Sequence, residues 1–254
     1  MALYLIGLGL EDEKSITFRG LEIIRNADFV FLDNYTSRIV DFDINKMELF
    51  FGKKIDLAER NFLENTEKII ELSKNRDVVI LTAGDPMVAT THIQLKIDAE
   101  EKNIPVKIIN NASIINALGN IGLEIYKLGK ITSIPFTTES FFPESPYDVI
   151  KENNSINAHT LCLLDLKPNE KKFMSFNEAL DYLLRIEEKR KENVINDNTL
   201  VLGCAALGSK RERVVFGRVS EVINKKFLEI PQCLVILSKL HFVEESSLKK
   251  YSVK

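Results

Sequence analysis

The feature that most constrains the fold is an alternation, in residues 1–110, of short apolar runs with segments of helical spacing. The runs are continuous in hydrophobicity, as expected for strands that are buried on both faces of a sheet. This alternation is typical of a mainly parallel sheet with helices on its faces, the α/β class. The expected strands cover residues 2–8, 28–32, 77–81 and 104–109.

The run at residues 77–81 ends in Gly84-Asp85-Pro86, and a helical pattern begins at residue 93. Glycine allows a ligand to approach the backbone closely, and proline stiffens a turn. Asp85 adds a hydrogen-bond acceptor. Ligands of open α/β sheets bind outside the carboxyl ends of the strands. The sequence therefore predicts that residues 81–92 line a small-molecule site.

The regular alternation of apolar runs and helical segments ends after residue 110. Ser175 can cap a long amphipathic helix, and further apolar runs follow it. We expect two α/β domains, residues 1–110 and 111–254, which meet at a ligand cleft. The expected strands of the second domain cover residues 131–135, 159–166, 200–206, 214–219 and 233–237.

Composition excludes several classes of protein. The net charge of −3 lacks the basic excess that is typical of nucleic-acid binding. No apolar run is long enough for a transmembrane helix, so we expect a cytoplasmic protein without a membrane partner. The three cysteines, Cys162, Cys204 and Cys233, have apolar neighbours and no CxxC spacing. They are expected to be reduced core thiols, and the sequence predicts no metal site.

Gly7-Leu8-Gly9 follows the first expected strand, as in dinucleotide-binding proteins. That fingerprint requires a third glycine, and Asp12 stands in its place. A carboxylate there would repel a pyrophosphate. A nicotinamide site is therefore disfavoured. A simple glycine turn, or close approach to a ligand without phosphate, stays open.

Other polar residues lie at similar junctions. Asp165 closes an apolar run, and Ser113 opens a helix, so both can face the same cleft as Asp85. His159 and His241 are expected to be structural. We assign no catalytic residue. Asp165 and His92 are candidates for a base on polarity alone.

Several segments, in order along nearly the whole chain, resemble the diphthine synthase family of the tetrapyrrole-methylase superfamily. The combination of Gly-Asp-Pro with Ala-Thr-Thr-His is more specific than any glycine motif. The segments are Leu3-Tyr4-Leu5-Ile6-Gly7-Leu8-Gly9-Leu10, Tyr35-Thr36-Ser37, Gly84-Asp85-Pro86, Ala89-Thr90-Thr91-His92, Ala112-Ser113-Ile114, Tyr126-Lys127-Leu128-Gly129, His159-Thr160-Leu161, Leu164-Asp165, Lys167 and Lys239-Leu240-His241.

The resemblance implies two α/β domains with S-adenosylmethionine in the cleft between them. It implies methylation of a modified histidine, 3-amino-3-carboxypropyl-histidine, on translation elongation factor two during diphthamide biosynthesis. The accepting group is an amine, and in eukaryotic relatives a carboxylate is methylated as well. Whether three or four methyl groups are added stays open. The resemblance also implies a homodimer.

Matching the family's motifs implies a set of cofactor contacts in this chain. Two of these positions depart from the family pattern. The family usually has histidine where this chain has Gln232, and a small residue where it has Leu207. The implied contacts are Leu10, Asp85, Val88, Ser113, Ile114, Leu164, Leu207 and Gln232.

Three other functions remain as alternatives. A tetrapyrrole methyltransferase of the same superfamily would bind a large acidic macrocycle, which the Ala-Thr-Thr-His and Tyr35-Thr36-Ser37 segments disfavour. A nicotinamide-dependent oxidoreductase is disfavoured by Asp12. A non-catalytic module that binds the methyl donor or the elongation factor fits the departures at Leu207 and Gln232.

Overall fold

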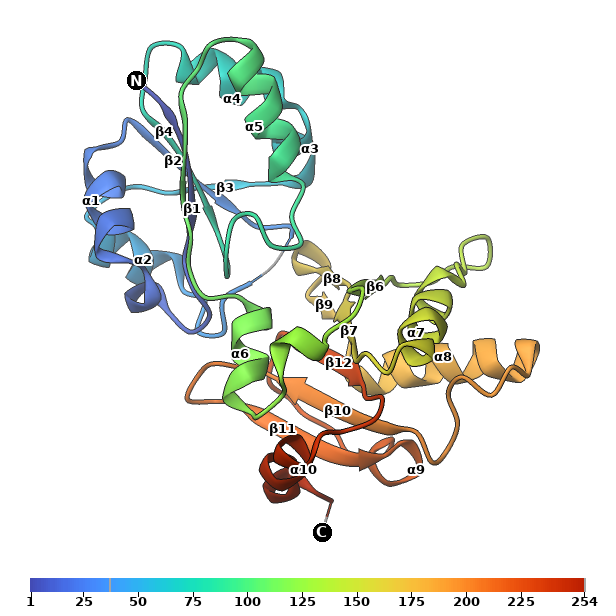
Figure 1. Cartoon of the computed structure of the whole chain (residues 1–254). Helices are drawn as coiled ribbons and strands as arrows, with labels where there is room; N and C mark the ends of the chain where they lie inside the picture. Colours follow the sequence, from blue (N-terminus) through green and yellow to red (C-terminus); the bar gives the residue numbers. More distant parts are fainter. Residues whose placement is uncertain (37, 254) are drawn as a thin grey trace. The chain divides into compact units, whose positions relative to one another are not determined.

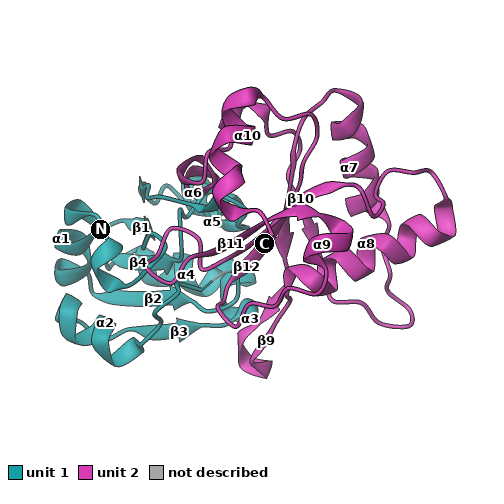
Figure 2. Ribbon diagram, turned by 90° about the horizontal axis from the view of Figure 1, so that it is seen from below, with its two compact units in different colours: residues 1–114 teal, residues 115–254 magenta. Residues whose placement is uncertain are grey.

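The computed structural model describes residues 1–36 and 38–253 and divides into two compact units, Met1–Ile114 and Ile115–Lys254 (Figure 2). The domain boundary expected after residue 110 falls shortly before this division. Ser37, which contributes to the family resemblance, lies outside the described residues, as does Lys254 at the end of the expected second domain. Each unit contains its own sheet and its own hydrophobic core.

Unit 1 is built on a five-stranded sheet with the order β3-β2-β4-β1-β5, in which every pairing is parallel. Side chains of β4 are buried along the whole strand, as its continuous apolar run predicts. The strands are β1 (Leu3–Gly7), β2 (Phe29–Asp33), β3 (Asp56–Ala58), β4 (Val78–Thr82) and β5 (Val106–Ile109).

Helices cover both faces of this sheet (Figure 1). Leu3 and Leu5 of β1 face one core with α3, α4 and α5, whereas Ile6 faces the other core with α1 and α2. This alternation follows from the period of two along a strand. The helices are α1 (Phe18–Asn26), α2 (Ile44–Phe51), α3 (Arg60–Glu64), α4 (Thr66–Ser73) and α5 (His92–Glu101).

Unit 2 has a five-stranded sheet with the order β11-β10-β12-β7-β6. Only β6 and β7 pair in parallel, and the other pairings are antiparallel. A short hairpin, β8 (Leu166–Lys167) and β9 (Lys172–Phe173), follows β7. The sheet strands are β6 (Thr132–Ile134), β7 (Thr160–Leu164), β10 (Leu200–Ala205), β11 (Arg213–Arg218) and β12 (Gln232–Ile236).

The core of unit 2 forms where α7, α8 and α9 pack against this sheet. Ser175 caps α8 as expected: its hydroxyl accepts the backbone N–H of Glu178 at 3.2 Å, and Glu178 accepts the N–H of Ser175 at 2.7 Å. The helices are α6 (Ile114–Asn120), α7 (Ser145–Ser155), α8 (Phe176–Arg190), α9 (Val219–Val222) and α10 (Phe242–Leu248).

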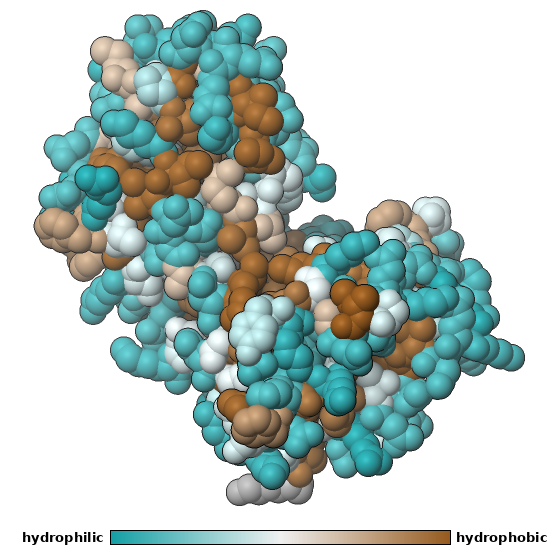
Figure 3. Space-filling model, viewed as in Figure 1, coloured by the Kyte–Doolittle hydropathy of each residue, from teal (hydrophilic) through white to brown (hydrophobic). Residues whose placement is uncertain are grey.

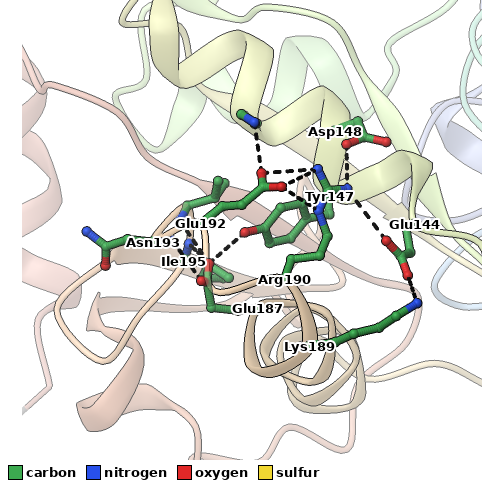
Figure 4. Close-up of polar contacts among 11 residues, drawn as sticks. Glu144, Tyr147, Asp148, Glu187, Lys189, Arg190, Glu192, Asn193 and Ile195 are labelled. Carbon is green, nitrogen blue, oxygen red and sulfur yellow. Dashed lines mark hydrogen bonds and ion pairs between the residues drawn. The ribbon is translucent and has the colours of Figure 1, made fainter.

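Polar contacts fix the end of α8 against α7 (Figure 4). The hydroxyl of Tyr147 donates to Glu187 at 2.7 Å, and the same carboxylate accepts the backbone N–H of Val194 at 2.8 Å. Arg190 pairs with Asp148 at 2.6 Å and with Glu192 at 3.0 Å. The mixed-sign end of this helix is therefore an ion-pair network that joins two helices of unit 2.

The C-terminal helix α10 is attached through the buried residue Glu244. Its carboxylate accepts from Lys127 at 2.6 Å and from Nε2 of His159 at 3.1 Å. The other ring nitrogen of His159 accepts the backbone N–H of Ser238 at 3.0 Å, so Nε2 carries the proton. His241 lies at the start of α10 and pairs with Glu124 at 3.3 Å. The structural roles expected for both histidines are confirmed.

The three cysteines are free and buried in the sheet of unit 2, as predicted for core thiols. Cys162 lies on β7, and Cys204 on β10 faces Cys233 on β12 across the ladder. Burial raises the pKa of Cys162 far above the ordinary value of a thiol, so this residue stays protonated at neutral pH.

Candidate functional site

The most distinctive point of unit 1 is the carboxyl edge of its sheet between β1 and β4. These strands are neighbours, but the helices that follow them lie on opposite faces, α1 on one and α5 on the other. The chain thus leaves adjacent strands in opposite directions, which makes this edge a topological switch point. Such a switch point is where open α/β sheets bind ligands.

Glycines bring the two loops at this edge into contact. Gly9 and Gly84 exchange backbone hydrogen bonds of 3.1 and 2.7 Å, and both have left-handed φ angles of 74°. A Cβ on Gly7 would lie 2.5 Å from the carbonyl oxygen of Gly84. The Gly-x-Gly sequence therefore serves close approach between two protein loops. The side chain of Asp12 accepts the N–H of Lys14 at 2.9 Å, in its own turn.

Asp85 is buried and joins two loops of the carboxyl edge. One carboxylate oxygen accepts the backbone N–H of Met87 at 2.9 Å. The other accepts from the side chain of Asn110 and from the backbone N–H of Asn111, each at 3.0 Å. Asp85 thereby ties the loop after β4 to the loop after β5, where Ser113 lies.

The loop after β4, residues 83–91, folds around the carbonyl oxygen of Pro86. This oxygen accepts from the hydroxyl of Thr90 at 2.6 Å and contacts Nδ1 of His92 at 2.9 Å. Ala89 adopts a left-handed φ of 56°, which is unusual for a residue other than glycine. The loop is held by internal contacts in a conformation that its sequence alone does not favour.

The end of β2 adds Asp33, a buried carboxylate that sequence reasoning did not select. Its oxygens accept the backbone N–H groups of Tyr35 and Thr36 at 2.9 and 3.0 Å, and the hydroxyl of Thr36. Nε2 of His92 lies 3.2 Å away, at ion-pair distance but outside hydrogen-bond geometry. Burial alone would raise the pKa of Asp33, but the contacts with His92, Thr36 and Tyr35 outweigh it and lower the pKa.

A small pocket lies beside this carboxylate, at the ends of β1, β2 and β4. Its lining is mostly apolar, with polar groups from the segment after β2. A useful signal was present in the sequence, since Asp33 ends an apolar strand as Asp85 follows one. The lining residues are Leu8, Leu32, Asp33, Asn34, Arg38, Ile39, Phe42 and Ala83.

The predicted cofactor contacts of unit 1 lie on loops at the carboxyl edge of its sheet. Leu10 follows β1, Val88 lies in the loop after β4, and Ser113 and Ile114 follow β5. Leu10, Val88 and Ile114 are partly exposed apolar side chains, whereas Ser113 is buried. Apolar walls and a few convergent polar groups suit a nucleoside or a thioether.

The remaining predicted contacts gather at one edge of the sheet of unit 2. Leu164 ends β7, Gln232 begins the antiparallel strand β12, and Leu207 follows β10. The register brings their neighbourhoods together, since Leu163 pairs with Cys233 and Ala205 pairs with Gln232. Within each unit, the structure places the predicted residues at a common edge.

The side chain of Gln232 is engaged within unit 2. Its oxygen accepts the N–H of Phe176, the first residue of α8, at 3.0 Å. Its amide nitrogen donates to the carbonyl oxygens of Phe227 and Glu229 at 3.1 and 3.0 Å. Gln232 thus satisfies the start of a helix and the segment before β12, a role that the sequence did not reveal.

The two candidates for a base also make structural contacts. The carboxylate of Asp165 accepts the backbone N–H groups of Phe136 and Leu166, each at 2.9 Å. His92 is only 2% exposed. A general base must reach the proton that it removes, and these contacts favour a supporting role for both residues.

Among residues 1–36 and 38–253, no group of three or more histidine, cysteine, aspartate or glutamate side chains could hold a metal ion. In the same residues, no helix combines the length and the apolar character needed to cross a bilayer.

Comparison with known proteins defines the class of this fold and site. Residues 2–223 match the family model of the tetrapyrrole (corrin/porphyrin) methylases, so the chain has the α/β fold of these methylases and is a methyltransferase. Within that class, the chain belongs to the diphthine synthase family. It is 46% identical over 246 residues to diphthine synthase of Methanococcus aeolicus, covering 96% of each chain. It is also 46% identical over 250 residues to that of Methanocaldococcus jannaschii, covering 97% of each.

A solved structure of diphthine synthase is similar over almost the whole molecule. It has a TM-score of 0.90 and 37% sequence identity, and the match covers 99% of this chain and 96% of the other. The fold class, the family and the kind of enzyme predicted from the sequence are confirmed. The full-length matches favour the diphthine synthase family over a tetrapyrrole-specific methylase, an oxidoreductase or a binding module.

Proposed function

We propose that this protein transfers methyl groups from S-adenosylmethionine to the 3-amino-3-carboxypropyl-histidine of translation elongation factor two, in diphthamide biosynthesis. The observation that carries this proposal is the similarity to diphthine synthases over 96–97% of the chain. The switch point at the carboxyl edge of the sheet of unit 1 supports it, because the predicted cofactor residues of that unit lie on the loops at this edge.

The cofactor contacts form part of the proposal. Leu10, Val88 and Ile114 offer partly exposed apolar surface to an adenosine and a thioether. Asp85 has lone pairs beyond its internal hydrogen bonds, since a carboxylate has about four acceptor positions. S-adenosylmethionine supplies an activated methyl group on a sulfonium. The proposed contacts are Leu10, Asp85, Val88, Ser113 and Ile114 of unit 1 with Leu164, Leu207 and Gln232 of unit 2.

The reaction needs little chemistry from the protein. A lone pair of the acceptor amine forms a bond to the methyl carbon, the carbon–sulfur bond breaks, and S-adenosylhomocysteine leaves. Holding donor and acceptor in line can supply most of the rate enhancement. The amine must lose a proton before it attacks, and water can accept it. The proposal therefore requires neither a metal ion nor a catalytic triad.

The acceptor is tested with labelled S-adenosylmethionine and elongation factor two that carries the unmethylated intermediate. Label is expected on the modified histidine, and no transfer to a factor that a known diphthine synthase methylates would refute the proposal. A mass spectrum of the product counts the methyl groups. Mild alkali removes a methyl ester but not the N-methyl groups, which separates three from four additions.

The cofactor site is tested with Asp85→Ala and titration of S-adenosylhomocysteine. The substitution removes an acceptor at the switch point and leaves the N–H of Asn111 without its partner. We expect the dissociation constant to rise about tenfold, which corresponds to ~1.4 kcal/mol. An unchanged dissociation constant in a folded variant would remove Asp85 from the site.

We also propose that the protein is a cytoplasmic homodimer. Hydrophobic surface lies over α5 in Figure 3, where Ile93 and Ile97 are 51% and 42% exposed on one side of the helix. Exposed apolar surface of this kind often marks an interface. Sedimentation at low concentration is expected to give twice the monomer mass, and a monomer would contradict this proposal.

A further inference from the structure

His92 supports the loop of residues 83–91 through a single backbone atom. Its Nδ1 lies 2.9 Å from the carbonyl oxygen of Pro86, which also accepts the hydroxyl of Thr90. A carbonyl oxygen only accepts hydrogen bonds, so Nδ1 must carry a proton. Pro86 lies between Asp85 and Val88, so this contact sets the path of the backbone between these two proposed cofactor contacts.

The same loop contains a residue that needs support. Ala89, next to Val88, has a left-handed φ of 56°. Residues other than glycine adopt this conformation only when the surroundings hold them there. Both donors to the Pro86 carbonyl, Thr90 and His92, follow Ala89 in the sequence, whereas Pro86 precedes it, so these contacts close the loop around Ala89. Without them, Ala89 is free to return to a favoured region, and Val88 moves with it.

The ring of His92 is itself held from the opposite side. Asp33, at the end of β2, lies 3.2 Å from Nε2, and the side chains of both residues are almost fully buried. The carboxylate is fixed by the backbone N–H groups of Tyr35 and Thr36. Because both side chains are buried and in contact, Asp33 limits the positions that the ring can take. The imidazole is thus located between the end of β2 and the loop after β4.

We propose that His92, located by Asp33, is a positioning residue for the methyl-donor site: by holding the Pro86 carbonyl it fixes the loop that presents Asp85 and Val88. This inference rests on the proposed cofactor contacts of those two residues. It gives the Ala-Thr-Thr-His segment a task in cofactor binding, although His92 itself is buried away from any ligand.

The test compares His92→Leu with His92→Asn. Leucine and asparagine have the same branched outline, but only asparagine keeps an N–H donor near the position of Nδ1. We expect the dissociation constant of S-adenosylhomocysteine to rise about tenfold in H92L and to stay within about threefold of wild type in H92N. If His92 only stabilised the fold, the dissociation constant of S-adenosylhomocysteine would rise equally in both variants. Equal affinities in H92L and wild type would overturn the proposal.

Two further measurements separate the proposal from loss of stability. Ile24→Val, in a core of the same unit, is expected to lower the unfolding midpoint without changing the dissociation constant. In the wild-type NMR spectrum, the Nδ1–H proton of His92 is expected to exchange much more slowly than that of the exposed His241. If the Nδ1–H protons of both histidines exchanged equally fast, the hydrogen bond between His92 and the Pro86 carbonyl would be contradicted. This measurement does not require the cofactor. Failure of wild type to bind S-adenosylhomocysteine would instead count against the proposed function.

Discussion

At the carboxyl edge of the sheet of unit 1, the backbones of two loops approach so closely that several positions require glycine. The loops after β1 and β4 are joined by backbone hydrogen bonds between Gly9 and Gly84. A Cβ on Gly7 would lie 2.5 Å from the carbonyl oxygen of Gly84. No side chain fits between these atoms. The glycines at this edge therefore serve the close contact between two protein loops.

We predict that Gly7→Ala lowers the free energy of unfolding by about 2–3 kcal/mol, because overpacking against a backbone atom cannot be relieved by a side-chain rotation. The matched control is Gly119→Ala in α6, where the added Cβ meets Ile125 at an ordinary 3.6 Å. That change is expected to stabilise the protein by ~0.5–1 kcal/mol. Denaturant unfolding measures both. A Gly7 variant as stable as wild type would show that the loops separate easily.

The sequence predicts those site residues that can be recognised by their place after a buried strand. Asp85 was selected because it follows a buried strand, and the structure places it at the switch point. Asp33, the last residue of β2, was not selected, because nothing in the sequence shows that His92 approaches it. The contacts of Gln232 with the start of α8 also join residues distant in sequence.

Among the helices and strands, local signals decided how well the sequence predicted the structure. Ser175 caps α8 through a short-range hydrogen bond, as the sequence predicts, and Thr17 caps α1 in the same way. For α2 the sequence alone also allows Asn45 as the cap, but in the structure the cap is Asp43, which accepts the N–H groups of Asn45 and Lys46. Two acceptable capping residues only two positions apart cannot be ranked by residue type alone.

We predict that Ser175→Ala lowers the free energy of unfolding by about 1 kcal/mol, because α8 loses the acceptor for its third N–H group. Ser155→Ala provides the control. The hydroxyl of Ser155 is exposed at the end of α7 and donates to the carbonyl of Glu152, so its removal should change stability by less than ~0.5 kcal/mol. Equal effects of the two substitutions in thermal unfolding would argue against the capping box.

The pairing of the strands was predicted for unit 1, as a mainly parallel sheet, but not for the sheet of unit 2. A parallel sheet that is buried on both faces leaves continuous apolar runs in the sequence. The runs of unit 2 were recognised as strands, but their order and antiparallel pairing depend on long-range contacts such as Cys204 with Cys233. The hairpin β8–β9 has strands of two residues and left no pattern to detect.

For the whole molecule, buried titratable groups link stability to pH. Burial lowers the pKa of His159 from its ordinary 6.5, although Glu244 opposes this effect. Burial would raise the pKa of Glu244, but the hydrogen bonds that it accepts from His241, Lys127 and Glu124 lower it from 4.5. In both cases the unfolded chain binds protons more readily than the folded protein, so acid destabilises the fold.

We predict that the unfolding midpoint falls as pH drops below about 6.5, where the unfolded chain protonates His159 first, and falls further below about 4.5 through Glu244. His159→Gln should remove the first part, because glutamine can donate to Glu244 and accept from Ser238 without titrating. His241→Gln, at an exposed site, is the control and should keep it. The measurement is the thermal unfolding midpoint between about pH 5 and pH 8. If this midpoint falls with pH in H159Q as it does in wild type, His159 is excluded as the cause.

The three cysteines allow the opening of unit 2 to be measured by thiol labelling. All three are buried in the sheet of unit 2, and unit 1 contains none. A thiol reagent added to the native protein can therefore react only when that sheet opens. The rate of labelling then reports the kinetics of opening of one half of the chain, without any engineered probe. Repeated with S-adenosylhomocysteine present, the same measurement shows whether a ligand protects unit 2.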